Sequence, residues 1–419
     1  MMQAESLNNN HLKLYCDTAK KGDDFVGIKA SSDGVEILFP IGYRIPDNDR
    51  EIRRDIRQLI RVLSIYTENG GQSITYQDGT QSAADFPLAA CMYVIEYFYS
   101  LGGNYYTERE TVYRHSVNGT QDWPKTVRNV LPLAQTKNDS VSFIFTDFIV
   151  RDQTPNDSML ITTINRYCVY VSFQKIGWMY SDYLPKNPPS CPSKSLWLSV
   201  VMKKLASTND DRKQRLFQSM LDILRNEDSF SFDTDFYFGT ASFENVWERM
   251  IDNMFGTEDL REYQPKTMWE MDDGNRKENL PLRPDCVMQY SGEYYIIDAK
   301  YYQYGVSGNV NDLPSTESIT KQILYGEHVE FKLGKDPDKI HSVFIMPGNL
   351  ETDIHSKHLP TERKGEAYCI WRGKNKCYEV IVGVVLDMRY MIYNCIDRAE
   401  RKMRELADLC RLRYFLTGI

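Results

Sequence analysis

Apolar residues recur at helical spacing in some stretches of the chain and alternate with polar residues in others. Helical spacing predicts helices over about 49–67, 87–101, 159–173, 194–206, 210–226, 241–255, 315–331 and 387–411. Alternation predicts a hairpin over 23–46 and strands near 105–107, 142–149, 267–271, 340–346, 367–372 and 378–386. A second hairpin is predicted within 282–300, around Ser291-Gly292. Strands that alternate with helices in the second half predict an α/β fold with a mixed central sheet flanked by helices.

The stretch 185–192 contains four prolines in eight residues and predicts an extended linker. We therefore expect an α+β module over 1–190, which would recognise a target or dock a partner. A helical bridge over 191–230 and a second α/β domain over 231–419 complete the expected organisation.

Composition narrows the classes of function. The chain has 419 residues, enough for two or three domains, with 42% hydrophobic and 26% charged residues, as in soluble globular proteins. A net charge of -8 argues against a protein that only coats DNA, but not against a nuclease with clustered acids. Nine cysteines without a CxxC pair, and no signal peptide, predict reduced thiols in a cytoplasmic protein. No apolar run has membrane-spanning length.

The segment 282–300 (LRPDCVMQYSGEYYIIDAK) contains the candidate chemistry. Asp285 is expected on the first strand of its hairpin, and Asp298 on the second, with both carboxylates on one face. Such a pair can bind Mg²⁺, with Mn²⁺ as a substitute, and the backbone carbonyl of Ala299 can add an oxygen. Lys300 lies two residues after Asp298, so it points to the same face and can orient a water and offset phosphate charge. An apolar strand that ends in buried charges is costly unless those charges are paired or bind a metal.

The neighbouring helices supply further candidates. Glu244 and Glu248 are one turn apart on the 241–255 helix, and one of them, preferably Glu248 as a further metal ligand, is expected to complete the site. Gln322 and Tyr325 on the following helix are expected to face the site or a DNA backbone.

An arginine stripe follows the 49–67 helix. Arg50, Arg57 and Arg61 recur at helical spacing and are candidates for phosphate contact. A solvated helix face is the alternative interpretation.

These motifs resemble the PD-(D/E)XK nuclease superfamily. Within it the chain resembles the LlaJI-type restriction endonucleases and, more distantly, the McrC nuclease subunits of restriction systems. The matching segments are 26–29 (VGIK), 38–43 (LFPIGY), 119–127 (GTQDWPKTV), 238–240 (FGT), 243–248 (FENVWE), 282–285 (LRPD), 298–302 (DAKYY) and 321–325 (KQILY).

The resemblance implies Mg²⁺-dependent cleavage of double-stranded DNA in the restriction of foreign DNA. It places catalytic roles on Asp285, Asp298, Lys300 and one of the two helix glutamates. Because two strands must be cut, a homodimer or repeated nicking is expected.

Two alternatives remain open. The chain has no GxxxxGK[ST] phosphate loop, so a nuclease subunit that cuts only with a separate AAA+ NTPase motor fits the sequence. The second alternative is a non-catalytic adaptor that binds DNA or protein and retains a nuclease-like core.

Overall fold

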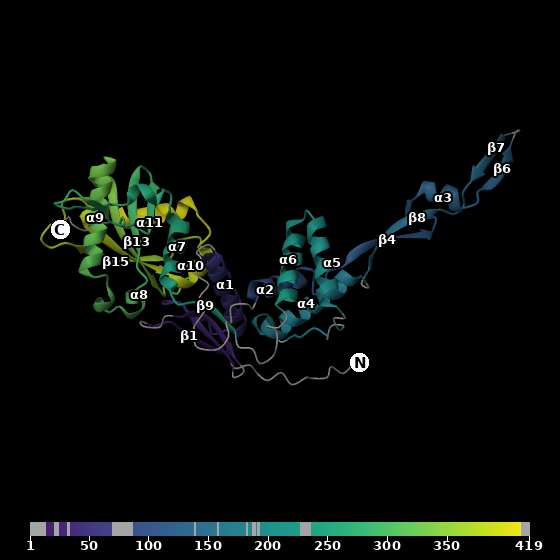
Figure 1. Ribbon diagram of the computed structural model, residues 1–419, viewed down its shortest axis with the longest axis horizontal. Coiled ribbons are helices and arrows are strands. Elements are labelled where there is room, and N and C mark those ends of the chain that lie inside the picture. Colours follow the sequence, from purple (N-terminus) through teal and green to yellow (C-terminus); the bar gives the residue numbers. More distant parts are fainter. Residues whose placement is uncertain are drawn as a thin grey trace. The chain divides into compact units, whose positions relative to one another are not determined.

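The computed structural model describes residues 14–20, 25–31, 34–68, 87–137, 140–156, 159–181, 183–186, 190, 193–226 and 236–411. They belong to two compact units (Figure 1). Unit 1 comprises 1–84 with 233–419, and unit 2 comprises 85–232. Helices and mixed sheets confirm the predicted α/β class.

The first sheet of unit 1 joins the start of the chain to its second half. Its order is β1 (Leu14–Thr18), β3 (Gly34–Phe39), β2 (Val26–Ser31) and β9 (Phe236–Thr240). β2 and β3 form the predicted hairpin, and β2 also pairs antiparallel with β9. The β2–β9 pair is tight, since a Cβ on Gly27 would lie 2.2 Å from the Phe238 carbonyl oxygen. The backbone φ of Gly27, +149°, also favours glycine at this position.

This pairing corrects the predicted division of the chain. Residues 26–39 lie in the same unit as 236–240, not in a separate module ending at 190. The prediction failed because a strand pair between distant segments leaves no local signal. The polar, glycine-containing stretch 69–82, for which the sequence predicts a loop, lies outside the described residues.

The second sheet of unit 1 is the predicted mixed sheet. Its order is β12 (Cys286–Tyr290), β13 (Glu293–Ala299), β14 (Ile340–Gly348), β16 (Val380–Asp387) and β15 (Thr361–Tyr368). β13, β14 and β16 are parallel, and the two edge strands pair antiparallel. Every residue of β14 is buried, as expected for a strand covered on both faces.

Helices cover this sheet. They are α7 (Phe243–Phe255), α8 (Tyr304–Ser307), α9 (Thr316–Leu333), α10 (Met388–Asn394) and α11 (Glu400–Arg411). α1 (Asp49–Glu68) packs on β2 and β9 of the first sheet and on α7 and α10. α7 packs on β12 and β13 through the predicted apolar face, which includes Trp247 and Met250. α9 packs on β13 and β14.

The predicted single helix over 387–411 is wrong. It is interrupted between α10 and α11, where the buried Lys402 donates hydrogen bonds to the carbonyl oxygens of Asn394 and Asp397. A lysine in a helix usually indicates a solvent-exposed face, so the buried hydrogen bonds of Lys402 could not be predicted from the sequence. Two strands are also shifted: β15 ends at Tyr368, and residues 145–148 separate β7 from β8.

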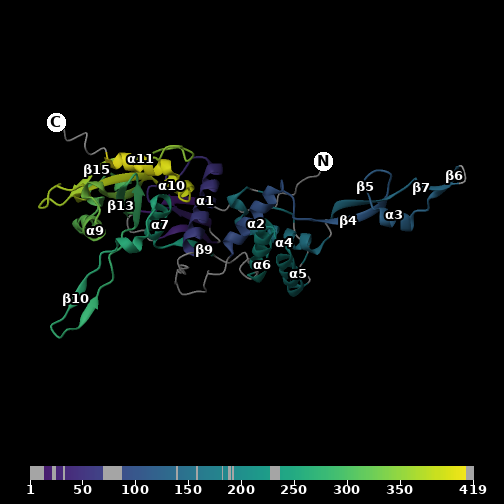
Figure 2. The same cartoon turned by 90° about the horizontal axis from the view of Figure 1, so that it is seen from above.

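A small hairpin precedes the second sheet. β10 (Met268–Glu270) and β11 (Arg276–Glu278) pair antiparallel, and all six residues are exposed. Figure 2 shows this hairpin projecting from the rest of unit 1.

Unit 2 combines packed helices with short strands. The helices are α2 (Leu88–Ser100), α3 (Trp123–Asn129), α4 (Leu160–Ile176), α5 (Lys194–Ser207) and α6 (Asp211–Arg225). The strands are β4 (Glu108–His115), β5 (Thr120–Gln121), β6 (Leu133–Lys137), β7 (Ser140–Ile144) and β8 (Ile149–Asn156). The segment predicted as strand over 105–107 precedes β4 and is not itself a strand. α6 packs on α2, and α5 packs on α6 and α4, so the expected bridge helices are part of unit 2. Among the described helices, none has the length and apolarity to cross a membrane.

Candidate active site

The antiparallel hairpin β12–β13 brings two aspartates together. Cys286 pairs with Ile297, so the next pair in the same register is Asp285 with Asp298. The Asp285 Oδ2 atom accepts a hydrogen bond of 2.8 Å from the Ala299 amide. Asp298 is only 1% exposed. The structure therefore places both carboxyl groups at one end of a buried strand.

Lys300 lies beside this pair. Its Nζ is 2.8 Å from Asp298 Oδ2, and most of its side chain is buried. The Lys300 amide donates to the Ile345 carbonyl at 2.9 Å, which holds the residue at the end of the parallel strands. Asp298 and Lys300 are two residues apart in an extended segment, which explains why they share a face.

The two aspartates are electrostatically coupled. Burial raises the pKa of Asp285 to about 9, and the adjacent Asp298 carboxyl adds to this by hydrogen bonding and by charge repulsion. Burial also opposes the charge on Lys300, but Asp298 more than compensates and raises the pKa of the ammonium. The folded protein therefore favours the protonated form of the Asp285 carboxyl near neutral pH.

α7 contributes Glu248. Burial raises the pKa of this half-buried carboxyl, and the Asp298 charge raises it further, while Lys300 opposes the shift. Glu244 is exposed, and its charge is a smaller cause of the Glu248 shift. Of the two predicted glutamates, the structure thus couples Glu248 more directly to Asp298.

The α9 residues have other roles than predicted. Gln322 is fully buried and donates a 2.6 Å hydrogen bond to the Ile296 carbonyl. Tyr325 is also buried, and its hydroxyl donates at 2.6 Å to the carbonyl of Arg283. The structure therefore does not show these two side chains free to contact DNA. Each one bonds to a backbone carbonyl two residues before Asp285 or Asp298.

Lys321 was missed by the sequence analysis. Its ammonium lies 5.7 Å from the Tyr325 ring centroid, and its charge counteracts the raised pKa of Glu248. Its position directly before Gln322 was the available signal. It supplies a second cation on the side of α9 that faces the carboxyl groups.

The arginine stripe lies on a different helix. Arg50 and Arg61 are exposed on α1, and Arg57 is half-buried. Neighbouring arginines of this helix pair with acids, since Arg53 binds Asp49 at 2.8 Å. Phosphate contact by the stripe stays a prediction.

The donor set suits a hard cation. Within the described parts of the chain, no group of three or more His, Cys, Asp or Glu side chains could hold a metal ion. Mg²⁺ needs only one or two carboxylates, with water and phosphate as further ligands. Asp285 and Asp298 meet this requirement, and a cation between them would relieve the repulsion that raises the Asp285 pKa.

Comparison with known proteins gives three results. The family model described as LlaJI restriction endonuclease matches residues 25–358. The Type II restriction enzyme BsuMI component YdjA of Bacillus subtilis (strain 168) is 27% identical over 267 residues, which are 59% of this chain and 56% of that protein. The chain thus matches just over half the length of this relative.

The third result is a solved structure, the refined half-complex from a tetradecameric assembly of Thermococcus gammatolerans McrB AAA+ hexamers with bound McrC. The match covers 92% of this chain and 83% of that chain, at 14% identity and a TM-score of 0.35. At that TM-score the likeness supports no argument about fold or function.

Proposed function

Since the chain belongs to the LlaJI restriction endonuclease family, we propose that it is a Mg²⁺-dependent endonuclease that hydrolyses phosphodiester bonds in double-stranded DNA. Restriction of foreign DNA is the corresponding biological role. Mn²⁺ is expected to substitute for Mg²⁺.

The observation that carries this proposal is the end of strand β13. Three ionisable side chains, on Asp285, Asp298 and Lys300, meet there in a largely buried position. Burying charge costs several kcal/mol per ion unless the charges are compensated. A chain that needed only a stable sheet would not require this cluster, whereas metal-assisted hydrolysis does.

Each residue has a proposed task. Asp285, Asp298 and the Ala299 carbonyl would hold the Mg²⁺, which supplies Lewis acidity and neutralises phosphate charge. Lys300 orients the attacking water and stabilises negative charge on the phosphate. Glu248, whose pKa is raised by burial, would accept the proton of that water. The water oxygen bonds to phosphorus, and the bond from phosphorus to the 3′ oxygen breaks.

A plasmid-cleavage assay tests the proposal. The unaltered chain is compared with Asp298→Asn, with Mg²⁺ or with EDTA. Asp338 is an exposed carboxylate of the same unit, so Asp338→Asn is the matched control. Discrete fragments that require Mg²⁺ and are lost only in Asp298→Asn are the expected result. Cutting that persists in Asp298→Asn would refute the assigned site.

A second candidate is a nuclease subunit that depends on an AAA+ NTPase motor. Large apolar side chains are exposed on the strand-rich segment 108–156 of unit 2, which favours association with another protein. They include Val112, Tyr113, Val117, Trp123, Val127, Leu131, Leu133, Val141, Phe143 and Ile144. The sequence lacks a phosphate loop of its own, so the motor would be a separate chain.

The same assay separates the two candidates when NTP and an AAA+ NTPase motor subunit are added. Cutting that requires both additions supports the motor-dependent subunit. Cutting by the chain alone supports a self-sufficient endonuclease. An adaptor without catalysis is supported if no condition gives cutting that Asp298→Asn abolishes.

A further inference from the structure

The exposed hairpin β10–β11 has two chemically different faces. The register opposes Met268 with Glu278, Trp269 with Lys277 and Glu270 with Arg276. Opposed residues of a strand pair share a face, and consecutive residues alternate. Trp269 and Lys277 therefore lie on one face, here called the tryptophan face. Met268, Glu270, Arg276 and Glu278 lie on the other.

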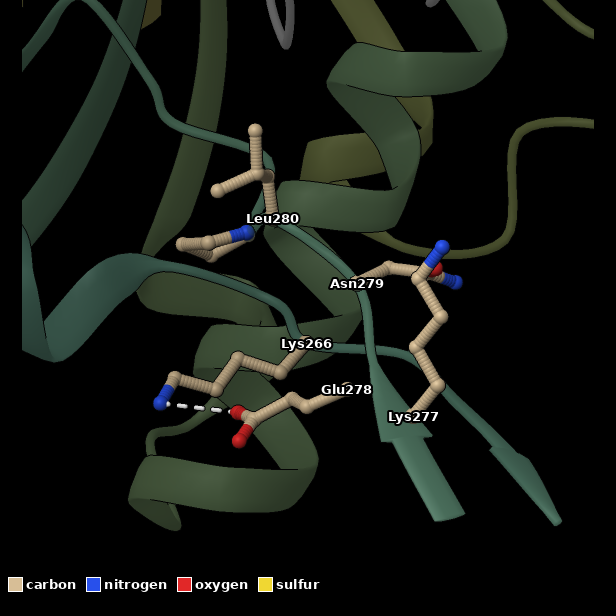
Figure 3. A pocket seen from close by; sticks show the side chains of 6 residues that line it. Lys266, Lys277, Glu278, Asn279 and Leu280 are labelled. Atoms are coloured by element: carbon tan, nitrogen blue, oxygen red, sulfur yellow. Dashed lines mark ion pairs between the residues drawn. The ribbon is translucent and has the colours of Figure 1, made fainter. Parts of the chain in front are cut away.

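The second face is electrically neutral. Arg276 pairs with Glu270 at 2.6 Å, and Lys266 pairs with Glu278 at 2.9 Å. Figure 3 shows the Lys266–Glu278 pair on one side of the hairpin base. Each charge on this face is compensated by its neighbour, so the face has little attraction for a polyanion.

The tryptophan face is different. Trp269 is 62% exposed. Lys277 and Asn279 lie together on the side away from the Lys266–Glu278 pair (Figure 3). Asn279 donates to the Thr267 hydroxyl at 3.0 Å, which places both polar groups on this face. The residues named on it include a cation, an amide, a hydroxyl and an indole, but no carboxylate.

This combination matches the chemistry of nucleic acid. Indole rings stack on bases, lysine neutralises phosphates, and amide and hydroxyl groups bond to phosphate or sugar oxygens. The carboxylates of the hairpin are on the opposite face or at the turn, where Asp272 and Asp273 lie.

The hairpin is also within reach of the DNA that the site would cut. Lys277 is eight residues before Asp285, a separation of at most about 28 Å in extended chain. At about 3.4 Å per base pair along the duplex axis, this corresponds to roughly eight base pairs. The chain continues from the end of β11 at Glu278 through Asn279 and Leu282 to Asp285.

We propose that the tryptophan face of the β10–β11 hairpin contacts duplex DNA beside the scissile phosphate, with Lys277 on a phosphate and Trp269 against a sugar or base. This inference rests on the proposed nuclease function. It assigns a DNA contact to unit 1 itself, so unit 1 would bind its substrate independently of any contact made by unit 2.

DNA binding by fluorescence anisotropy tests the inference. The full chain with Asp298→Asn, which leaves DNA uncut, is titrated onto a labelled duplex over a series of KCl concentrations. Trp269→Ala is compared with Met268→Ala, and Lys277→Ala with Arg276→Ala. Each pair removes the same kind of group from adjacent, exposed residues on opposite faces.

Trp269→Ala is expected to weaken binding about tenfold. Lys277→Ala is expected to weaken it about threefold and to reduce the salt slope by about 0.9, the value for one phosphate contact. Met268→Ala and Arg276→Ala should stay within about twofold of the parent. Circular dichroism should be unchanged in all four variants, because none of these side chains is buried.

Equal DNA affinities within both pairs overturn the inference. If the tryptophan-face variants bind DNA like their controls but no longer associate with an AAA+ NTPase motor subunit that binds the parent chain, the face is a protein interface and the DNA assignment is wrong. The proposed nuclease function fails separately, if the chain without Asp298→Asn binds duplex but does not cut it.

Discussion

The second sheet of unit 1 and the segment 108–156 of unit 2 depart in opposite ways from the usual distribution of side chains. At the end of β13, charged groups are buried, as with Asp298 at 1% exposure. In the segment 108–156, large apolar groups are exposed, as with Phe143 at 67% and Leu131 at 93%. Both arrangements are unfavourable in an isolated chain in water.

The difference lies in how each region compensates. The buried polar groups of unit 1 have partners inside the unit, since Asp285 accepts a hydrogen bond from the Ala299 amide and Lys300 pairs with Asp298. The exposed apolar side chains of unit 2 are not covered by other described residues, so their apolar surface faces water. The proposed function assigns chemistry to the first region, and its motor-dependent alternative assigns association with another protein to the second. Substitutions should therefore have large effects in the first region and small ones in the second.

The largest effect is expected for Lys300→Ala. The change removes the cation from a largely buried pair, so Mg²⁺-dependent cleavage should fall at least about a hundredfold. The free energy of unfolding should fall by up to about 3 kcal/mol at pH 8 in EDTA, because Asp298 is left buried without its partner. Plasmid cleavage and urea unfolding measure the two effects.

The double variant Asp298→Asn/Lys300→Ala is the control for this argument. It removes both charges, so it should regain most of the lost stability while remaining inactive. A double variant as unstable as Lys300→Ala would show that Lys300 acts through packing and not through charge compensation.

The next effect is a dependence of stability on pH. The raised pKa of Asp285, about 9 against 3.8, means that the folded state holds a proton that the unfolded state releases above about pH 4. The free energy of unfolding should therefore fall as pH rises, by at most about 2.7 kcal/mol between pH 6 and pH 8 in EDTA. Urea unfolding of the unaltered chain and of Asp285→Asn at the two pH values isolates this contribution.

Asp285→Asn should lack this part of the pH dependence, whereas Asp338→Asn should retain it. Mg²⁺ at pH 8 should raise the unfolding midpoint of the unaltered chain, because binding to the ionised pair replaces the proton. An equal pH dependence in the chain and in Asp285→Asn would mean that the aspartates are not coupled as the structure indicates.

The sequence predicted the β12–β13 hairpin better than the organisation around it. The β12–β13 pair and the α7 apolar face follow from local periodicity, and both were predicted close to their observed bounds. The antiparallel parity of Asp285 and Asp298 follows from the same pattern, because the turn at Ser291-Gly292 sets the register.

Contacts between distant segments were not predictable in this way. The β2–β9 pair depends on a complementarity between residues about 200 positions apart, for which one sequence gives no evidence. Gln322 and Tyr325 were assigned to the ligand side because they are polar, but they bond to backbone inside the unit. Polarity indicates that a group needs a hydrogen bond and does not say where the partner lies.

A smaller effect is expected for Tyr325→Phe. The change leaves the Arg283 carbonyl without its 2.6 Å donor, at a cost of about 1 kcal/mol in unfolding free energy. Cleavage should fall a few-fold, because the loop that leads to Asp285 loses a support. Tyr294→Phe in β13 is the control. Its hydroxyl accepts a hydrogen bond from Gln289, and its loss should leave cleavage unchanged. Equal cleavage by both variants would remove the positioning role of Tyr325.

The smallest change in stability is expected for Phe143→Thr in unit 2. Threonine keeps the preference of β7 for extended structure, and Phe143 is 67% exposed, so the free energy of unfolding should change by less than about 0.5 kcal/mol. Val150→Ala in β8 is the matched control, because Val150 is fully buried and its truncation should cost about 1–2 kcal/mol. Light scattering after size exclusion should show less self-association for Phe143→Thr, since an exposed apolar contact has been removed. If Phe143→Thr instead destabilised the chain as much as Val150→Ala, Phe143 would belong to the core of unit 2, and the contrast with the buried charges of unit 1 would be lost.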